Sequence, residues 1–230
     1  MVLDLNSLPD VSGLSVGILG GTGDQGHGLA YRLARAGHQV RIGSRAAVRG
    51  AAAATELSAL PGVGPDTVTG GDNGYAAGAD LVIIAVPWAG HAELVAALAQ
   101  PLAGKIVVDC VNPLGFDKLG PYPLPVPEGS AAEQAAALLP ESRVCAAFHH
   151  VSAALLADPD VERIDLDVLV LGEDREAVAQ VQALACRIPN MRGLYAGRLR
   201  NAGQVEALTA NLIAINKRYK AHAGIRVTDL

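Results

Sequence analysis

The sequence predicts an α/β protein whose centre is a doubly wound parallel sheet. Three observations lead to this fold class. Short apolar runs alternate with helical patterns at close intervals over about the first 110 residues. Several runs are rich in β-branched residues and almost wholly apolar, as strands covered on both faces are. A glycine-rich turn separates the first apolar run from the first helical pattern, which is the arrangement of a Rossmann-type unit.

Each predicted strand is an apolar run that a turn signal ends. The run DLVIIAVP at 80–87 gives the strongest signal, because it is rich in β-branched residues and a proline stops it. The run LSVGIL at 14–19 precedes the glycine cluster, and KIVVDCVNP at 105–113 ends in Asn-Pro. The remaining predicted strands lie at 39–43, 67–69, 143–148, 166–171 and 194–196.

The predicted helices follow the 3.6-residue spacing of apolar side chains. In the helix 24–36, Leu29 and Leu33 share one face. The last predicted helix, 201–220, carries an apolar stripe that includes Leu212. Such a stripe packs into the core or against a second copy of the chain, so we expect a homodimer. The other helices are predicted at 46–60, 88–99, 130–139 and 174–186.

One segment, GFDKLGPYPLPVPEGS at 115–130, interrupts this alternation. It is dense in proline and glycine, so we predict a surface loop and exclude a long helix or a central strand. We place the boundary between two units next to it. Residues 1–113 form the first unit, and residues 114–230 form a small C-terminal α/β extension that packs back against it.

Composition limits the class of protein. Half of the 230 residues are hydrophobic and the net charge is −5, which is typical of a globular protein and argues against a general nucleic-acid binder. No apolar stretch is long enough for a transmembrane helix, and residues 1–13 lack the basic start of a signal peptide. Cys110, Cys145 and Cys186 lie far apart. We therefore expect buried, unreactive thiols in a cytoplasmic protein, with neither disulfides nor a metal site.

The turn GTGDQG at 21–26 has the spacing G-x-G-x-x-G. Gly21 allows the tight turn, Gly23 lets the backbone approach a pyrophosphate, and Gly26 lets the helix pack closely on the strand. The free amides at the helix start then face the phosphates, and Asp24 is expected to point away from them. The alternative is a glycine turn that only connects two elements.

The second predicted strand lacks the carboxylate that follows it in most NAD-binding units. Ser44 and Arg45 stand there instead, and Arg49 follows one helical turn later. A hydroxyl and two guanidinium groups suit a 2′-phosphate, so the site is predicted to prefer NADP over NAD. The alternative is a solvated helix start, where arginine is common.

Five motifs follow one another along the chain: GGTGDQGHGLA, IGSR, AVPWAGH, FHHV and AGI. Together they resemble the NADPH-dependent coenzyme F420 reductases, also called F420H2:NADP+ oxidoreductases. The resemblance runs from about Leu14 to Ile225. A wider related group includes archaeal ferric reductase and pyrroline-5-carboxylate reductase-type proteins. The chain departs from the family in its N-terminal residues, its proline-rich segment and its second consecutive histidine.

The resemblance implies an oxidoreductase that moves a hydride between NADP(H) and the deazaflavin coenzyme F420. It also implies which residues bind these cofactors. Thr22, Gly23, Asp24 and Gln25 would bind the pyrophosphate, and Ser44, Arg45 and Arg49 the 2′-phosphate. Val86, Pro87, Trp88 and His91 would border the ribose and nicotinamide, with Asn112 and Pro113 at the end of the fifth strand. His149, His150, Val151 and Ala223 would border F420.

Hydride transfer between two cofactors needs no nucleophilic side chain, because it depends on stacking two rings in a dry slot. His149 or His150 would then stabilise charge on the second ring or serve only the structure. Trp88 either walls the nicotinamide or only packs, and His91 lies near it or at the surface. Two other functions stay open: an NADPH-dependent reductase of ferric chelates, flavins or small imines, and a non-catalytic NADP-binding redox sensor.

Overall fold

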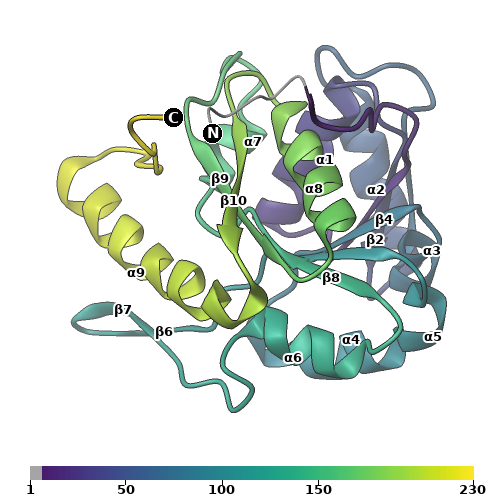
Figure 1. The fold of residues 1–230 in the computed structure, drawn as a ribbon. Coiled ribbons are helices and arrows are strands. Elements are labelled where there is room, and N and C mark those ends of the chain that lie inside the picture. Colours follow the sequence, from purple (N-terminus) through teal and green to yellow (C-terminus); the bar gives the residue numbers. More distant parts are fainter. Residues whose placement is uncertain (1–6) are drawn as a thin grey trace.

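The structure, a computed structural model, describes residues 7–230 and centres on an eight-stranded sheet (Figure 1). The strands are β1 Val16–Leu19, β2 Val40–Ser44, β3 Val68–Asp72, β4 Leu81–Ile84, β5 Ile106–Asp109, β8 Arg143–Ala146, β9 Asp167–Gly172 and β10 Arg192–Gly197. Their order is β10-β9-β8-β5-β4-β1-β2-β3. Every predicted strand is present, and the α/β fold class is confirmed. Residues 1–6, part of the segment predicted not to be a signal peptide, lie outside the described residues.

The sheet is parallel at its centre and changes direction near one edge. Strands β1 to β5 and β8 run in one direction. Strand β9 pairs antiparallel with β8, and β10 is parallel to β9. The C-terminal part thus extends the same sheet. Because the carboxyl ends of β1, β2, β4, β5 and β8 share one edge, the loops that follow these strands meet there.

Helices cover both faces of the sheet and bury an aliphatic core on each (Figure 1). One face is covered by α1 Asp24–Arg35, α2 Ala47–Ser58, α7 Ala153–Ala157 and α8 Arg175–Cys186. The other is covered by α3 Asn73–Ala77, α4 His91–Ala97, α5 Ala99–Leu102, α6 Ala131–Leu138 and α9 Ala202–Tyr219. This is the predicted doubly wound arrangement. None of the helices in the described part of the chain is long and apolar enough to cross a bilayer.

The helix predicted over 88–99 is broken into pieces. A 3-10 turn at Trp88–Gly90 precedes α4, and α5 begins only after Leu98. The backbone leaves helical dihedrals at Gly90, where φ is −143°, and at Leu98, where φ is −105°. Glycine favours such a break, because it loses the most backbone freedom when it is fixed in a helix. The break leaves Trp88 in a turn at the sheet edge, at the end of the loop that follows β4.

The proline-rich segment 115–130 is not a loop throughout, so this prediction is wrong for its first part. Strands β6 Leu114–Asp117 and β7 Gly120–Pro123 form an antiparallel hairpin. Gly120 completes the turn with a φ of +118°, which would strain any side chain. Proline is tolerated in this hairpin because each strand of a two-stranded ribbon has a free edge, where no amide donor is needed.

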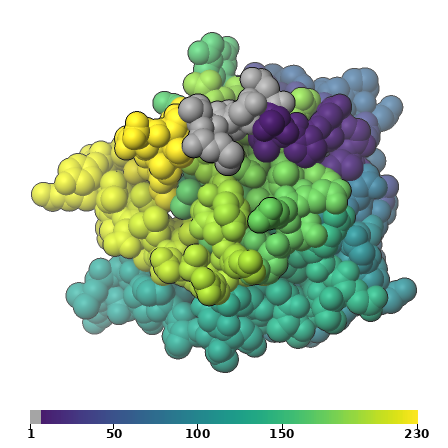
Figure 2. Space-filling model, in the orientation of Figure 1, coloured from purple at the N-terminus to yellow at the C-terminus, as the bar shows by residue number. Residues whose placement is uncertain are grey.

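The hairpin and α9 form a projection that we call the arm, residues 114–123 and 202–219 (Figures 1 and 2). Figure 2 shows α9 in yellow and the hairpin in teal on the same side of the molecule. A hollow of about 390 Å³ between them is lined by Tyr122 and Leu208, among others. The apolar stripe predicted for α9 also includes Ile215, which is 40% exposed, so the stripe is only partly buried.

The three cysteines are free thiols. Cys110 and Cys145 are buried, and burial raises the pKa of Cys145 to about 12. Cys186 is half-buried, and its sulfur accepts a hydrogen bond from the amide of Gly193. A thiol that stays protonated is a poor nucleophile, so the two buried cysteines are unreactive, as the sequence predicts. The prediction of burial is wrong for Cys186, which lies near the end of α8 and is only half-buried.

Candidate functional site

The glycine turn joins β1 to α1, and packing requires a glycine at two of its three glycine positions but not at the third. A Cβ at Gly26 would lie 2.8 Å from the carbonyl oxygen of Gly20, and one at Gly21 would lie 2.9 Å from the side chain of Ile42. These two glycines are needed for close packing. A Cβ at Gly23 would find its nearest such neighbour 3.5 Å away, so packing does not require a glycine there. The open space at Gly23 is available to a ligand.

The start of α1 is free of side-chain caps. Gly23 is the N-cap, and among residues 7–230 no side chain bonds the first amides of the helix. Asp24 is exposed, Thr22 is half-buried, and Gln25 donates from Nε2 to the carbonyl oxygen of Phe148 at 3.1 Å. An uncapped helix start beside an open glycine is the arrangement that binds phosphate groups.

Ser44, Arg45 and Arg49 lie where β2 passes into α2. Ser44 is buried at the end of the strand, and both arginines are exposed. Neither guanidinium has a hydrogen-bond or ion-pair partner among residues 7–230. The start of α2 also has no side-chain cap. Asp72, which is in register with Ser44, has its carboxylate turned to the amide of Tyr75 as the N-cap of α3. Two free cations at an uncapped helix start fit a phosphate.

The loop after β4 carries Val86, Pro87 and Trp88 to the same edge. Pro87 is exposed, whereas Val86 and Trp88 are half-buried. The rings of Trp88 and His91 have centroids 5.4 Å apart and are tilted by 32°. His91 is fully buried, so its ring has no exposed face for a ligand. The structure therefore places Trp88, and not His91, at the surface of the site.

His91 lies in a buried polar cluster whose other members were not predicted from the sequence. Its Nε2 lies 2.6 Å from Oδ2 of Asp109, and its Nδ1 lies 2.9 Å from Oε1 of Gln134. Burial lowers the pKa of His91, but the hydrogen bond and charge of Asp109 outweigh burial, and the net shift is upward. Glu206 on α9 caps the first two amides of α6, and burial raises its pKa to about 7.

His149 and His150 follow β8 and are buried without partners. Their exposed fractions are 3% and 4%, and in the described structure none of their four ring nitrogens has a hydrogen-bond partner. Burial lowers the pKa of each ring to about 4, so both are neutral at neutral pH. A buried polar group without a partner costs about 1–3 kcal/mol, and a polar group of a ligand would offset this cost.

The backbone of this loop is held by three other elements. Phe148 has a φ of +65°, a strained conformation for a bulky residue, and its carbonyl accepts from Gln25 on α1. The carbonyl of His149 accepts from Nδ2 of Asn112, at the end of β5, at 2.9 Å. The hydroxyl of Thr209 on α9 lies 3.2 Å from the same carbonyl. The backbone of the loop after β8 is thus fixed, while within residues 7–230 its two imidazole rings have no hydrogen-bond partner. Thr209 was not predicted.

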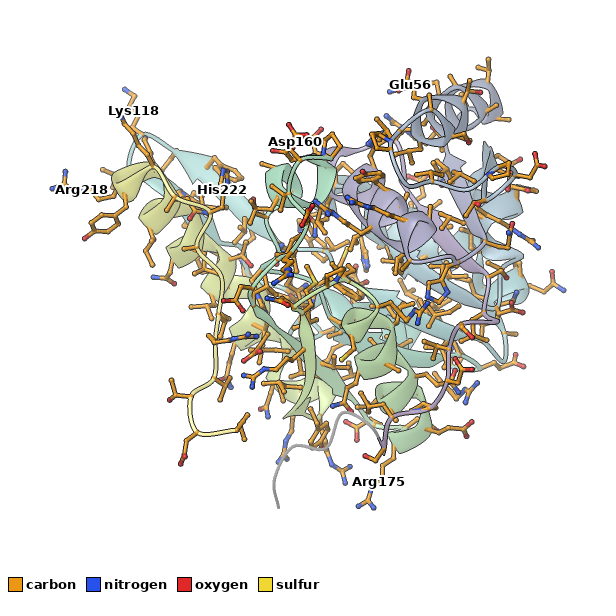
Figure 3. The ribbon with its side chains drawn as sticks, turned by 90° about the horizontal axis from the view of Figure 1, so that it is seen from above. Glu56, Lys118, Asp160, Arg175, Arg218 and His222 are labelled. Atoms are coloured by element: carbon orange, nitrogen blue, oxygen red, sulfur yellow. The ribbon has the colours of Figure 1, made fainter. Side chains whose placement is uncertain are left out.

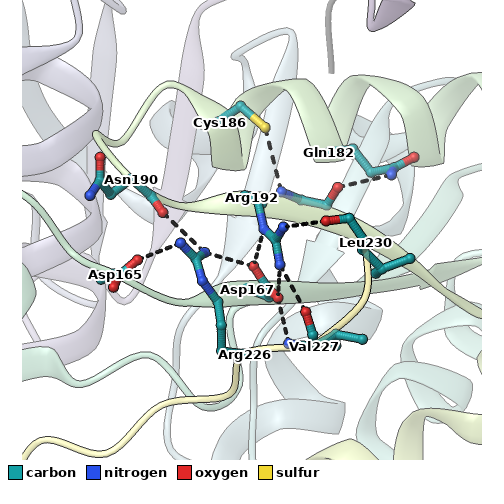
Figure 4. A network of polar contacts seen from close by, with 10 residues as sticks. Asp165, Asp167, Gln182, Cys186, Asn190, Arg192, Arg226, Val227 and Leu230 are labelled. Carbon is teal, nitrogen blue, oxygen red and sulfur yellow. Dashed lines mark hydrogen bonds and ion pairs between the residues drawn. The ribbon is translucent and has the colours of Figure 1, made fainter. Parts of the chain in front are cut away.

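The end of the chain returns to the sheet, where Asp167 holds it (Figure 4). Asp167 is fully buried and accepts hydrogen bonds from Arg192, from Arg226 and from a backbone amide of the tail. Burial would raise the pKa of Asp167, but these hydrogen bonds lower it to about 2. The tail fixed in this way includes Ala223, whose amide donates to Oδ1 of Asn216 at 2.6 Å.

The parallel strand order brings most of the predicted residues to one edge. Ser44 ends β2, and the loops after β1, β4, β5 and β8 carry the glycine turn, Trp88, Asn112 and His149. Ala223 belongs to none of these loops, because it lies in the C-terminal tail. Pro113 and Val151 are buried beside Asn112 and His150 in the chain. Within residues 7–230, no three His, Cys, Asp or Glu side chains gather as a metal site. The edge can bind a dinucleotide, with unpartnered neutral imidazoles beside it.

Comparison with known proteins points to one family. A family model described as "NADP oxidoreductase coenzyme F420-dependent" matches residues 15–113. The F420-dependent NADP reductase of Methanothermobacter thermautotrophicus is 37% identical over 223 residues, which cover 94% of this chain and 96% of that protein. The F420-dependent NADP reductase of Methanocaldococcus jannaschii is 38% identical over 224 residues, which cover 94% of this chain and 99% of that protein.

The likeness extends to a solved structure. The crystal structure of an Arthrobacter sp. FB24 protein assigned as an F420-dependent NADP-reductase matches with a TM-score of 0.78 and 32% identity. The match covers 94% of this chain and 100% of that chain. It therefore includes most of the C-terminal part, which the family model does not reach.

Proposed function

We propose that this chain, which belongs to the family of coenzyme F420-dependent NADP oxidoreductases, passes a hydride directly between two stacked cofactors at the carboxyl edge of its sheet. The chain is an oxidoreductase, and its cofactors are NADP(H) and F420. When bound, the nicotinamide and the deazaflavin supply the hydride donor and acceptor. The residues of the protein bind the two cofactors, orient them and exclude water.

The main support for the proposal is that the uncapped start of α1 lies next to the loop of the unpartnered His149 and His150. Gln25, within the glycine turn, donates to the carbonyl of Phe148, the residue before His149, at 3.1 Å. The uncapped start of α1 suits a pyrophosphate, and His149 offers neutral ring nitrogens to a second ligand. Two adjacent sites of this kind suit two cofactors that react with each other.

The NADP half of the proposed site comes from residues 1–113. We assign the turn 21–26 to the pyrophosphate, because α1 begins there without a cap. Ser44, Arg45 and Arg49 bind the 2′-phosphate, because both guanidinium groups are exposed and have no partner in the part of the chain that the structure describes. Val86, Pro87 and Trp88 border the ribose and nicotinamide.

The F420 half comes from residues 114–230. His149, His150 and Val151 border the deazaflavin, and Ala223 closes this side through the tail that Asp167 holds. A neutral imidazole donates at one nitrogen and accepts at the other, so His149 can serve a ring whose charge changes during the reaction. Asn112 keeps the carbonyl of His149 in place.

A spectrophotometric assay with NADPH and F420 tests this function. The absorbance at about 420 nm should fall when both cofactors are present, and NADH in place of NADPH should react far more slowly. FMN, ferric chelate and pyrroline-5-carboxylate serve as competing acceptors. Faster NADPH oxidation by one of these would contradict the F420 assignment. NADPH binding without oxidation by any acceptor would indicate a sensor.

The arm supports a homodimer. Phe116, Leu119 and Tyr219 are 68%, 97% and 72% exposed. Lys118 and Arg218 lie at the same end of the molecule (Figure 3). Large apolar side chains gathered on one projection are typical of a contact surface. A second copy of the chain fits this surface, because each copy presents the same arm to its partner about a twofold axis.

Sedimentation equilibrium tests the dimer. The wild-type chain should sediment as a dimer, and Leu119→Glu combined with Tyr219→Glu should sediment as a monomer. The matched control is Val48→Glu, on an exposed position of α2 outside the arm, which should stay dimeric. A wild-type monomer, or a dimeric double variant, would contradict the proposal.

A cytoplasmic location completes the proposal. The three free cysteines support it, because a reducing compartment keeps thiols unpaired.

A further inference from the structure

His91 is buried beside the chain's only tryptophan, and its contacts give it a role that a ligand-binding residue would not have. We propose that His91 is a positioning residue, held as an imidazolium between Asp109 and Gln134, which fixes Trp88 and the end of β5 at the edge where the cofactors meet. The expected effect of His91 on the reaction rests on the proposed function. The contacts that His91 makes with Asp109, Gln134 and Trp88 do not depend on any cofactor.

The orientation of Gln134 requires a proton on His91 Nδ1. The Gln134 amide nitrogen donates to Oε2 of Glu128 at 3.2 Å, which leaves its oxygen to face His91. An amide oxygen only accepts hydrogen bonds, so Nδ1 has to donate. Glu128 thus orients the Gln134 amide, and this orientation in turn requires the proton on Nδ1.

The contact with Asp109 requires a second proton. His91 Nε2 and Asp109 Oδ2 are 2.6 Å apart, so a proton lies between them. The hydrogen bond and charge of Asp109 favour the protonated imidazole, so this proton resides on the ring. The other oxygen of Asp109 accepts from the amide of Val111 at 2.9 Å. The result is a buried ion pair in which both oxygens of the carboxylate are used.

Groups on three neighbouring elements favour protonation of His91, and two of these groups are charged. Asp109 on β5 and Glu206 on α9 favour the protonated ring, and the hydrogen bond to Gln134 on α6 adds to them. Burial opposes protonation, and the net pKa of His91 is raised. The cluster thus joins α4, β5, α6 and α9 behind the site.

Two links connect this ion pair to the site surface. The imidazolium lies 5.4 Å from the Trp88 ring, centroid to centroid, within the range in which a cation attracts an aromatic ring. Asp109 holds the amide of Val111, and the next residue, Asn112, bonds the carbonyl of His149. Neutralising His91 should therefore disturb the indole and the histidine loop together.

Nitrogen-15 NMR of the cofactor-free protein, labelled at histidine, tests the charge of the ring. Both nitrogens of His91 should show the imidazolium shift at a pH above about 6.5, the ordinary pKa of histidine. His38 provides the internal reference for a neutral buried ring, because burial lowers its pKa. A neutral His91 at neutral pH would overturn the proposal, whatever the activity assay shows.

The variant His91→Gln tests the positioning role. An imidazolium quenches nearby indole fluorescence, so emission from Trp88 in the cofactor-free variant should rise. The kcat for F420 reduction should fall about tenfold, while the KM for NADPH changes by less than about twofold. His38→Gln, the same change at a buried histidine outside the site, should alter neither. Unchanged emission and unchanged kcat in a folded His91→Gln protein would overturn the proposal. If that variant does not fold, Asp109→Asn provides the same two measurements.

Discussion

His91 and His149 are buried histidines at the same edge of the sheet, yet their surroundings differ. His91 has a partner at each ring nitrogen, whereas His149 has none in the described structure. Their exposed fractions are 0% and 3%, so burial does not distinguish them. The pKa of His91 is raised and that of His149 is lowered to about 4. A fully paired histidine completes the fold, and an unpaired one is available to a ligand.

Removing Asp109 should remove the difference between His91 and His149 at the greatest cost in stability. In Asp109→Leu the imidazolium of His91 loses its counter-charge in a buried site, and the free energy of unfolding should fall by about 3 kcal/mol. Urea denaturation measures this change. Asp160→Asn, at an exposed loop position, should stay within about 0.5 kcal/mol of the wild type. A loss below about 1 kcal/mol in Asp109→Leu would show that the pair contributes little.

The two histidines should respond to pH with opposite signs. The pKa of His149 is about 4 in the folded chain, against about 6.5 in the unfolded chain. Between these values the unfolded chain binds more protons. Protonation of His149 on acidification should therefore lower the free energy of unfolding by about 3 kcal/mol, and His149→Phe should remove this share of the loss. The pKa of His91 is raised, so its contribution is complete below its unfolded pKa and is lost as the pH rises through its folded pKa.

Urea denaturation of the wild type, His149→Phe and His91→Gln, on both sides of about pH 6.5, separates the two contributions, because the His149 effect lies below that pH and the His91 effect lies above it. The variant His149→Phe should still lose some stability on acidification, because the pKa of His150 is also lowered to about 4. The same pH profile in wild type and His149→Phe would contradict a buried, neutral His149.

His149→Phe should also separate activity from stability. Because the phenyl ring offers no polar atom to a ligand, kcat for F420 reduction should fall about tenfold or more. Near neutral pH the variant should unfold no more readily than the wild type, since it removes two unpartnered polar atoms worth about 1 kcal/mol. NADPH affinity, measured by titration, should be unchanged. Full turnover in this variant would remove His149 from the mechanism.

The two exposed arginines should give the smallest change, because they lie apart from both histidines. Arg45→Ala and Arg49→Ala should each weaken NADPH binding by about fivefold, because solvent screens an exposed charge. NADH binding should not change. The difference in stability between His91→Gln and His149→Phe should also stay the same when either arginine is replaced. Equal losses for NADPH and NADH would contradict the assignment of the 2′-phosphate to these residues.

Local patterns in the sequence predict the first half of the fold and site well. The glycine turn needs only its own strand and helix, and Arg45 and Arg49 lie next to the strand that presents them. The hairpin was missed because prolines usually exclude strands, and a two-stranded ribbon with free edges is the exception.

The buried cluster was missed for a different reason. Asp109, Gln134 and Glu206 meet only when α6 and α9 pack behind β5, and no local pattern encodes that contact. One signal was present, since Asp109 is a charged residue inside the apolar run 105–113 and so required a buried partner. Thr209 gave no comparable signal, because a threonine within a helix is ordinary.

The claim that the cofactors react directly is tested by a single turnover with NADPH deuterated at both C4 positions, in ordinary water, with F420 as acceptor. Direct transfer predicts that the reduced deazaflavin carries deuterium at C5, in an amount equal to the NADPH consumed. Product that carries hydrogen from the solvent at that carbon would show that the two rings do not meet, and would contradict the shared site between the glycine turn and His149.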